Sequence, residues 1–107
     1  MKVRVTELDQ LPRGRGVKVT IGEHKIAMFR IEDDVYAIAD RCSHAEASLA
    51  EGEIWDGCVE CPRHGSEFDL KTGEPASLPA TVPVPVYEVA IEDGTVYVEV
   101  EDQWSVT

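Results

Sequence analysis

Two short cysteine–histidine segments constrain this chain more than any other feature. The first is Cys42-Ser43-His44 and the second is Cys61-Pro62-Arg63-His64, with sixteen residues (45–60) between them. Each segment is short enough to place both of its side chains on one tight loop, so two such loops can clamp a metal centre from both sides. Two thiolates and two imidazoles suit an iron–sulfur centre in which cysteine holds one iron and histidine the other. The same donors also suit tetrahedral zinc.

A third cysteine keeps the zinc alternative open. Cys58 and Cys61 have the Cys-x-x-Cys spacing of zinc knuckles, so zinc held by Cys42, Cys58, Cys61 and one histidine is chemically reasonable. A thioredoxin-like redox pair has the same spacing, but it requires the N-terminus of a helix in a β-α-β setting. This part of the chain has the pattern of strand and loop. We therefore expect Cys58 to be a small buried residue on a strand that enters the second loop.

Charge excludes two classes of partner. The chain of 107 residues has 21 acidic and 10 basic side chains, which gives a net charge of −11. Nucleic acids and anionic membrane surfaces require a basic face, so neither is an expected partner. An acidic surface instead favours association with the basic docking face of another protein. The hydrophobic fraction of 43% is ordinary for one globular domain.

Cysteine usage and the N-terminal pattern indicate the cellular setting. Three cysteines are an odd number, which disfavours a pure disulfide framework and favours a reducing, cytoplasmic location. The first six residues alternate apolar and polar side chains and lack the features of a signal peptide. No apolar run approaches the roughly 18 residues that a membrane span needs.

Alternation of apolar and polar side chains predicts an antiparallel all-β domain. The pattern indicates strands at residues 3–8, 17–21, 24–31, 35–39, 86–91 and 96–100. It breaks between Asp40 and Pro85, a stretch that contains both cysteine–histidine segments and all but one of the prolines. Long loops in a small domain are usually functional. Trp55 in this stretch is expected to be a packing residue.

The two segments and their surroundings resemble the Rieske-type [2Fe–2S] proteins. The resemblance extends through Gly65-Ser66, the run Phe68-Asp69-Leu70-Lys71-Thr72-Gly73 and a proline-rich stretch at residues 79–85, and it covers nearly the whole chain. It implies a single Rieske domain over residues 1–107, with an antiparallel β-sandwich base and an inserted cluster-binding subdomain at about 40–85. It also implies one [2Fe–2S] cluster per chain. Cys42 and Cys61 would bind one iron, His44 and His64 would bind the other, and Gly65, Ser66 and Pro83 would surround the cluster.

Two departures from the high-potential members of that family indicate the ferredoxin subtype. Those members carry an additional cysteine in each loop, and the two form a disulfide; here Arg63 occupies the second-loop position, and residues 44–47 contain no cysteine. Phe68 replaces a tyrosine that donates a hydrogen bond to a cysteine sulfur, which phenylalanine cannot do. Ser66 matches a serine that donates to a bridging sulfide. We therefore expect a low reduction potential that Ser66 raises somewhat.

The resemblance implies a soluble electron carrier with no catalytic residue of its own. Such ferredoxins pass single electrons from a flavin-dependent reductase to a terminal non-haem iron dioxygenase that hydroxylates aromatic rings, in aromatic hydrocarbon catabolism. A small accessory subunit is an alternative, similar to those of nitrite reductases or iron–sulfur assembly systems. A zinc-stapled binding module without a redox role is the third and weakest hypothesis.

Overall fold

The computed structural model describes residues 1–42, 47–63, 65–76 and 82–100. Within them the chain forms short strands and two single turns of 3₁₀-helix, so the predicted all-β class is confirmed. The elements are β1 (Lys2–Glu7), η1 (Leu8–Gln10), β2 (Gly16–Ile21), β3 (His24–Ile31), β4 (Asp34–Ala39), η2 (Leu49–Glu51), β5 (Ile54–Trp55), β6 (Cys58–Glu60), β7 (Glu67–Asp69), β8 (Val86–Tyr87), β9 (Val89–Glu92) and β10 (Thr95–Glu99).

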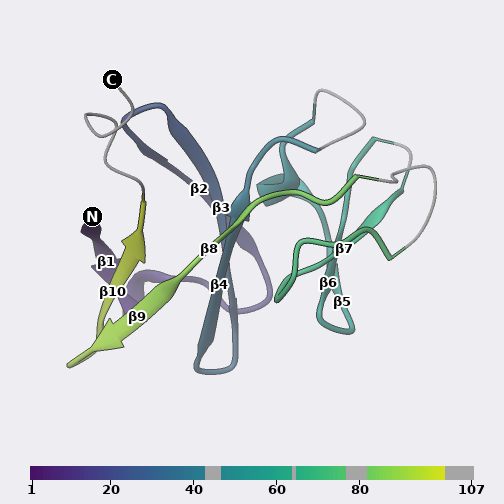
Figure 1. Ribbon diagram of the computed structural model, residues 1–107. Helices are drawn as coiled ribbons and strands as arrows, with labels where there is room; N and C mark the ends of the chain where they lie inside the picture. The colour runs from purple at the N-terminus through teal and green to yellow at the C-terminus, as the bar shows by residue number, and fades with distance from the viewer. Residues whose placement is uncertain (43–46, 64, 77–81, 101–107) are drawn as a thin grey trace, which may run out of the picture.

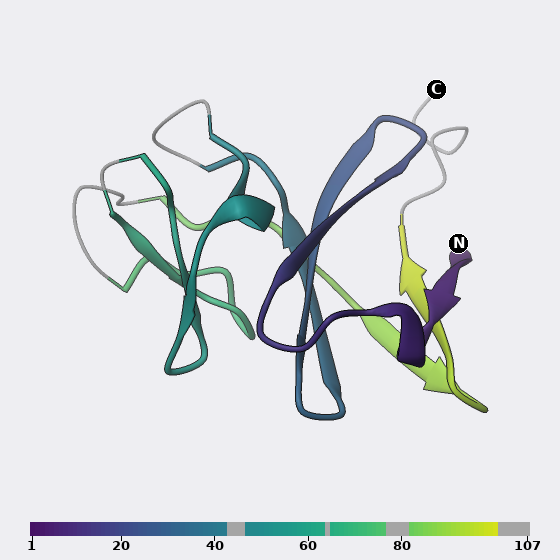
Figure 2. The ribbon, with the colours of Figure 1, turned by 180° about the vertical axis from the view of Figure 1, so that it is seen from behind.

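These strands form three antiparallel sheets. The orders are β1-β10-β9, β2-β3-β4-β8 and β5-β6-β7. The four-stranded sheet lies between the other two, with the β1-β10-β9 sheet on one side and the β5-β6-β7 sheet on the other (Figure 1). The view from behind shows the same order (Figure 2). None of the helices in the described residues is long and apolar enough to cross a membrane.

Strand β3 is buried on both of its faces. Ile26, Ala27, Met28 and Phe29 are each 0% exposed. Because successive side chains of a strand point to opposite faces, Ala27 and Phe29 enter one apolar cluster and Ile26 and Met28 enter another. The first cluster lies toward the β5-β6-β7 sheet, and the second contains Val96 and Val98 of β10. The sequence pattern alone predicted a half-buried strand here.

The strand predicted over residues 86–91 is divided in the structure. Residues 86–87 form β8, which pairs with β4, whereas residues 89–92 form β9, which pairs with β10. Glu88 therefore lies where the chain leaves one sheet and joins the next. The alternation of side chains continues from residue 86 to residue 91, so the hydrophobic pattern does not indicate that the chain changes sheets. A turn at Asp93-Gly94, where both residues have positive φ, links β9 to β10.

The proline-containing stretch is fixed to the β7 end by a close backbone contact. The Val84 N–H donates to the Gly73 carbonyl at 2.8 Å, and the Gly73 N–H donates to the Asp69 carbonyl at 2.7 Å. Gly73 has a φ of +76°, and a Cβ atom there would lie 2.1 Å from the Val84 carbonyl oxygen. Glycine is therefore required by both conformation and space. Val84 is buried and Pro83 is exposed, while residues 77–81 lie outside the described residues.

Candidate metal centre

Cys42 and Cys61 occupy equivalent positions on two loops of equal length. The Cys42 N–H donates to the Ala47 carbonyl at 3.1 Å, and the Cys61 N–H donates to the Ser66 carbonyl at 2.6 Å. Each cysteine therefore begins a six-residue loop that is closed by its own amide. Cys42 follows β4 by three residues, and Cys61 immediately follows β6. The sheets thus set the position of both thiols.

The buried carboxylate of Asp40 holds the base of the first loop. Its Oδ1 oxygen accepts hydrogen bonds from the Ser48 hydroxyl at 2.8 Å and from the Ala50 N–H at 2.9 Å. The Asp40 carbonyl also accepts from the Leu49 N–H at 2.6 Å. The ammonium of Lys18 lies 3.7 Å from the Oδ2 oxygen. A carboxylate with two donors and a nearby cation is satisfied inside the protein, so this residue links both ends of the loop.

Backbone geometry shapes the second loop. The Gly65 N–H donates to the Cys61 carbonyl at 3.2 Å, and Gly65 has a φ of +75°, which glycine adopts without strain. The side chain of Ser66 is fully buried beside this turn. That burial agrees with a position close to the metal centre. The roles predicted for Gly65, Ser66 and Pro83 around a cluster remain predictions.

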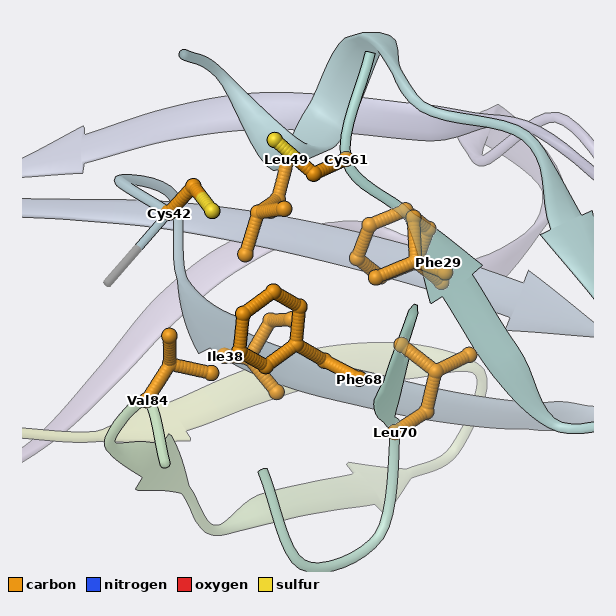
Figure 3. Close-up of a cluster of buried hydrophobic side chains, with 10 residues drawn as sticks. Phe29, Ile38, Cys42, Leu49, Cys61, Phe68, Leu70 and Val84 are labelled. Atoms are coloured by element: carbon orange, nitrogen blue, oxygen red, sulfur yellow. The ribbon is translucent and has the colours of Figure 1, made fainter. Parts of the chain in front are cut away.

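The two thiols lie together in an apolar environment. Cys42 is 2% exposed and Cys61 is 0% exposed, and both belong to the buried cluster that contains Leu49, Phe68 and Val84. Figure 3 shows both sulfur atoms close to Leu49 in one part of the group, with Phe68 and Val84 in another part. Each loop therefore contributes one thiol to the same buried place.

The electrostatic setting of Cys61 fits a metal ligand. Burial is the main cause that raises the pKa of the Cys61 thiol, and the neighbouring Cys42 raises it further. A hydrogen bond from the Arg63 backbone N–H opposes this and favours the thiolate. A buried thiol such as Cys61 is costly to ionise alone, but a metal cation would supply the missing positive charge and deprotonate a coordinating thiol outright. The donor set therefore fits a metal centre.

Of the other residues considered as ligands, the two histidines lie outside the described residues and Cys58 lies within them. His44 and His64 lie outside the described residues, so their assignment as ligands stays a prediction. Cys58 is described, and it does not join the buried cluster that holds Cys42 and Cys61. No group of three or more histidine, cysteine or acidic residues in the described parts of the chain is placed to hold a metal ion. This arrangement contradicts a zinc site built from Cys42, Cys58 and Cys61.

Cys58 also differs from the buried residue expected from the sequence. It lies on β6, as predicted, but its side chain is half-buried and lies on the opposite face from the fully buried Val59. Burial raises the pKa of its thiol, and the carboxylates of Asp69, Glu67 and Asp56 raise it further. A strand of three residues is too short for its apolar–polar alternation to predict which face packs against the core.

Comparison with known proteins identifies the family. Residues 1–88 match the family model of the Rieske [2Fe-2S] domain. This chain belongs to the Rieske [2Fe–2S] family. The chain is 44% identical over 93 residues to the anthranilate 1,2-dioxygenase ferredoxin subunit of Burkholderia cepacia, an alignment that covers 87% of this chain and 86% of the relative.

Solved Rieske structures share the fold over almost the full length. The ferredoxin of carbazole 1,9a-dioxygenase from Nocardioides aromaticivorans IC177 superposes with a TM-score of 0.89 at 38% identity, covering 92% of this chain and 96% of that chain. A chain from a complex of reduced oxygenase and oxidized ferredoxin in carbazole 1,9a-dioxygenase gives 0.85 at 40% identity, with coverages of 91% and 100%. The protein is thus a Rieske ferredoxin, an electron carrier rather than a catalyst, with a single [2Fe–2S] cluster.

Sequence reasoning did not find Asp40 as part of this site. Its position two residues before Cys42 was the only signal in the sequence. That signal is weak, because acidic side chains are common in this chain and most of those in the described residues are exposed. The three-dimensional contact with Ser48 and Ala50 gives it a role that spacing alone does not indicate.

Proposed function

We propose that this Rieske ferredoxin carries single electrons from a flavin-dependent reductase to a terminal oxygenase that hydroxylates aromatic rings. The observation that carries the proposal is the pair of buried cysteines on matched loops at one edge of the fold. The relatives described above support the partners, since their names include dioxygenase ferredoxin subunits and an oxygenase–ferredoxin complex.

The chain's own residues would position and protect the cluster. Cys42 and Cys61 would bind one iron and His44 and His64 the other, and the cluster, when bound, gains or loses one electron. Leu49, Phe68 and Val84 exclude water from the sulfur side of the site. Such exclusion keeps the local dielectric low and protects the centre from side reactions.

Domain organisation and cellular setting accompany this function. We treat residues 1–107 as a single Rieske domain, in which residues 40–85 are the inserted subdomain that holds the cluster. We also keep the cytoplasmic setting, which the odd number of cysteines supports. Neither feature is required for the electron-transfer role itself.

Spectroscopy and reconstitution test the proposal in two stages. Anaerobically purified protein should contain two irons per chain, and reduction with dithionite should give the rhombic electron paramagnetic resonance signal of a mixed cysteine–histidine cluster. The purified ferredoxin should then be added to a flavin-dependent reductase and a terminal oxygenase of a ring-hydroxylating dioxygenase system. Product formation should require the ferredoxin, and unchanged turnover without it would refute the assignment. Electron delivery to a neighbouring nitrite reductase instead would favour the accessory-subunit alternative.

A further inference from the structure

The β5-β6-β7 sheet has one buried face and one face turned away from the core. Ile54, Val59 and Phe68 are neighbours across its ladders and all pack into the apolar core. Because side chains alternate along strands, the residues between them share the opposite face. We call this the outer face, and it consists of Glu53, Trp55, Cys58, Glu60, Glu67 and Asp69.

Trp55 is a large apolar side chain that protrudes from the outer face. It is 74% exposed, which contradicts the packing role expected from the sequence. It is the last residue of β5 and precedes the tight turn at Asp56-Gly57, where both residues have positive φ. An indole can bury 150–250 Å², roughly, at an interface. Tryptophan is also among the residues that most often dominate binding energy there.

Acidic side chains form a row beside this tryptophan. Glu60 is the register partner of Glu67 on β7, and the Glu60 N–H donates to the Glu53 carbonyl at 2.8 Å on the other side. Like charges directly opposite each other across a ladder destabilise a sheet. None of the ion pairs among the described residues includes Glu53 or Glu60. The carboxylates of Glu53 and Glu60 are therefore available to a partner.

The negative field on the outer face is also felt by its own cysteine. Asp69, Glu67 and Asp56 each raise the pKa of the Cys58 thiol, in addition to the larger effect of burial. The outer face thus combines a protruding aromatic side chain with the carboxylates of Glu53 and Glu60, which take part in none of the ion pairs of the described residues. A partner that complements it must be basic and must offer an apolar hollow for the indole.

The outer face lies directly beside the second cysteine loop. Glu60 immediately precedes Cys61, and Glu67 immediately follows Ser66. The sheet forms the side of the molecule remote from β1-β10-β9 (Figures 1 and 2). A protein bound to this face would therefore be adjacent to one half of the metal centre.

We propose that the outer face docks the basic surface of a redox partner protein, with Trp55 as the apolar anchor and Glu53 and Glu60 facing lysine or arginine side chains. This inference rests on the proposed electron-transfer function and specifies the surface that the partner uses. Docking beside Cys61 shortens the path between the two redox centres. The negative charge steers the encounter, and the indole slows dissociation.

A basic redox protein that is independent of the natural system provides the test. Mammalian ferricytochrome c is strongly basic and is reduced by one electron, so one reduced cluster yields one ferrous haem and one oxidised cluster without a proton. The dithionite-reduced holoprotein, freed of excess reductant, is mixed with it in a stopped-flow instrument. The second-order rate constant is measured from low to high ionic strength, where screening removes the attraction between exposed charges.

Two double variants separate the outer face from net charge. Glu53→Gln with Glu60→Gln removes two charges from the face, and Glu23→Gln with Glu88→Gln removes two exposed charges elsewhere. We expect the first to lower the low-salt rate constant by about fivefold or more, with the difference vanishing at high salt, and the control to lower it by less than about twofold. Equal effects of the two double variants would overturn the proposal.

Trp55→Ala tests the anchor. We expect about a tenfold lower rate constant at both low and high salt, with a smaller loss for Trp55→Phe. An unchanged rate constant for Trp55→Ala would remove the tryptophan from the docking surface. All substituted side chains are exposed, and an unaltered electron paramagnetic resonance signal verifies that the cluster is intact.

The cytochrome c measurement and the reductase–oxygenase assay can fail independently of each other. A face-specific effect on cytochrome c reduction, together with failed turnover in the reductase–oxygenase assay, would mean that the docking surface is real and the natural partners are different. Successful turnover without any face-specific effect on either partner would mean that the function stands and the docking surface is wrong.

Discussion

Oδ1 of Asp40 lies 2.8 Å from the Ser48 hydroxyl, which donates to it across the base of the first cysteine loop. The same oxygen accepts the Ala50 N–H at 2.9 Å. One buried oxygen therefore fixes two points on the far side of the loop that begins near Cys42. The position of the Cys42 thiol depends on this connection.

Asp40→Ala is expected to lower both stability and cluster content. The substitution leaves the Ser48 hydroxyl and the Ala50 N–H without their acceptor, so the free energy of unfolding should fall by about 3 kcal/mol. Iron per chain should fall below two after purification. Asp40→Asn is the matched control, because its amide oxygen can still accept, and it should lose less stability and retain more iron. Equal losses in the two variants would indicate that charge matters and that the hydrogen bonds do not.

Cysteine substitutions should divide into two classes. Cys42→Ser and Cys61→Ser remove thiols from the shared buried site, so both variants should lose the visible absorption of the cluster. Cys58→Ser changes a side chain on the other face of β6 and should retain full colour and two irons per chain. Visible spectra and iron analysis of the three purified variants check this. Loss of the cluster in Cys58→Ser would mean that this thiol is a ligand.

Gly73 should tolerate alanine far less well than Gly94. Both have positive φ, but a Cβ on Gly73 would lie 2.1 Å from the Val84 carbonyl oxygen, whereas nothing lies within 4 Å of one on Gly94. Gly94→Ala should cost only the left-handed backbone strain, about 1–2 kcal/mol. Gly73→Ala should cost at least about 3 kcal/mol, because backbone must move as well. Urea unfolding of both variants measures the difference, and similar midpoints would contradict the close contact.

Alkylation of Cys58 should require higher pH than alkylation of an ordinary thiol. Burial and the carboxylates of Asp69, Glu67 and Asp56 raise its pKa, so at a given pH the folded protein has less of the reactive thiolate. Iodoacetamide labelling of the holoprotein, followed by mass spectrometry against pH, should show a midpoint above that of the urea-unfolded chain. Asp69→Asn should lower the midpoint, since one negative charge is removed. A midpoint equal to that of the unfolded chain would contradict the raised pKa.

The sequence predicted the parts of this protein that have local signals. Strand positions outside residues 40–85 followed from alternation, whereas β5 and β7 lie inside that stretch and were not predicted. The two cysteine loops followed from the spacing of Cys42 and Cys61, because spacing along a loop is a local property. Three features depend on contacts between distant segments and were not predicted. They are the burial of β3 on both faces, the exposure of Trp55, and the hydrogen bonds of Asp40.

Strand β3 has a consequence for engineering. Because Ala27 and Phe29 pack against the cysteine-bearing half while Ile26 and Met28 pack against the base, residues 40–85 do not contain a complete core of their own. A fragment cut at those limits would expose one side of its apolar cluster to water. Transfer of this electron-carrying centre to another scaffold therefore requires β3 and β4 as well, because β3 contributes side chains to both apolar clusters.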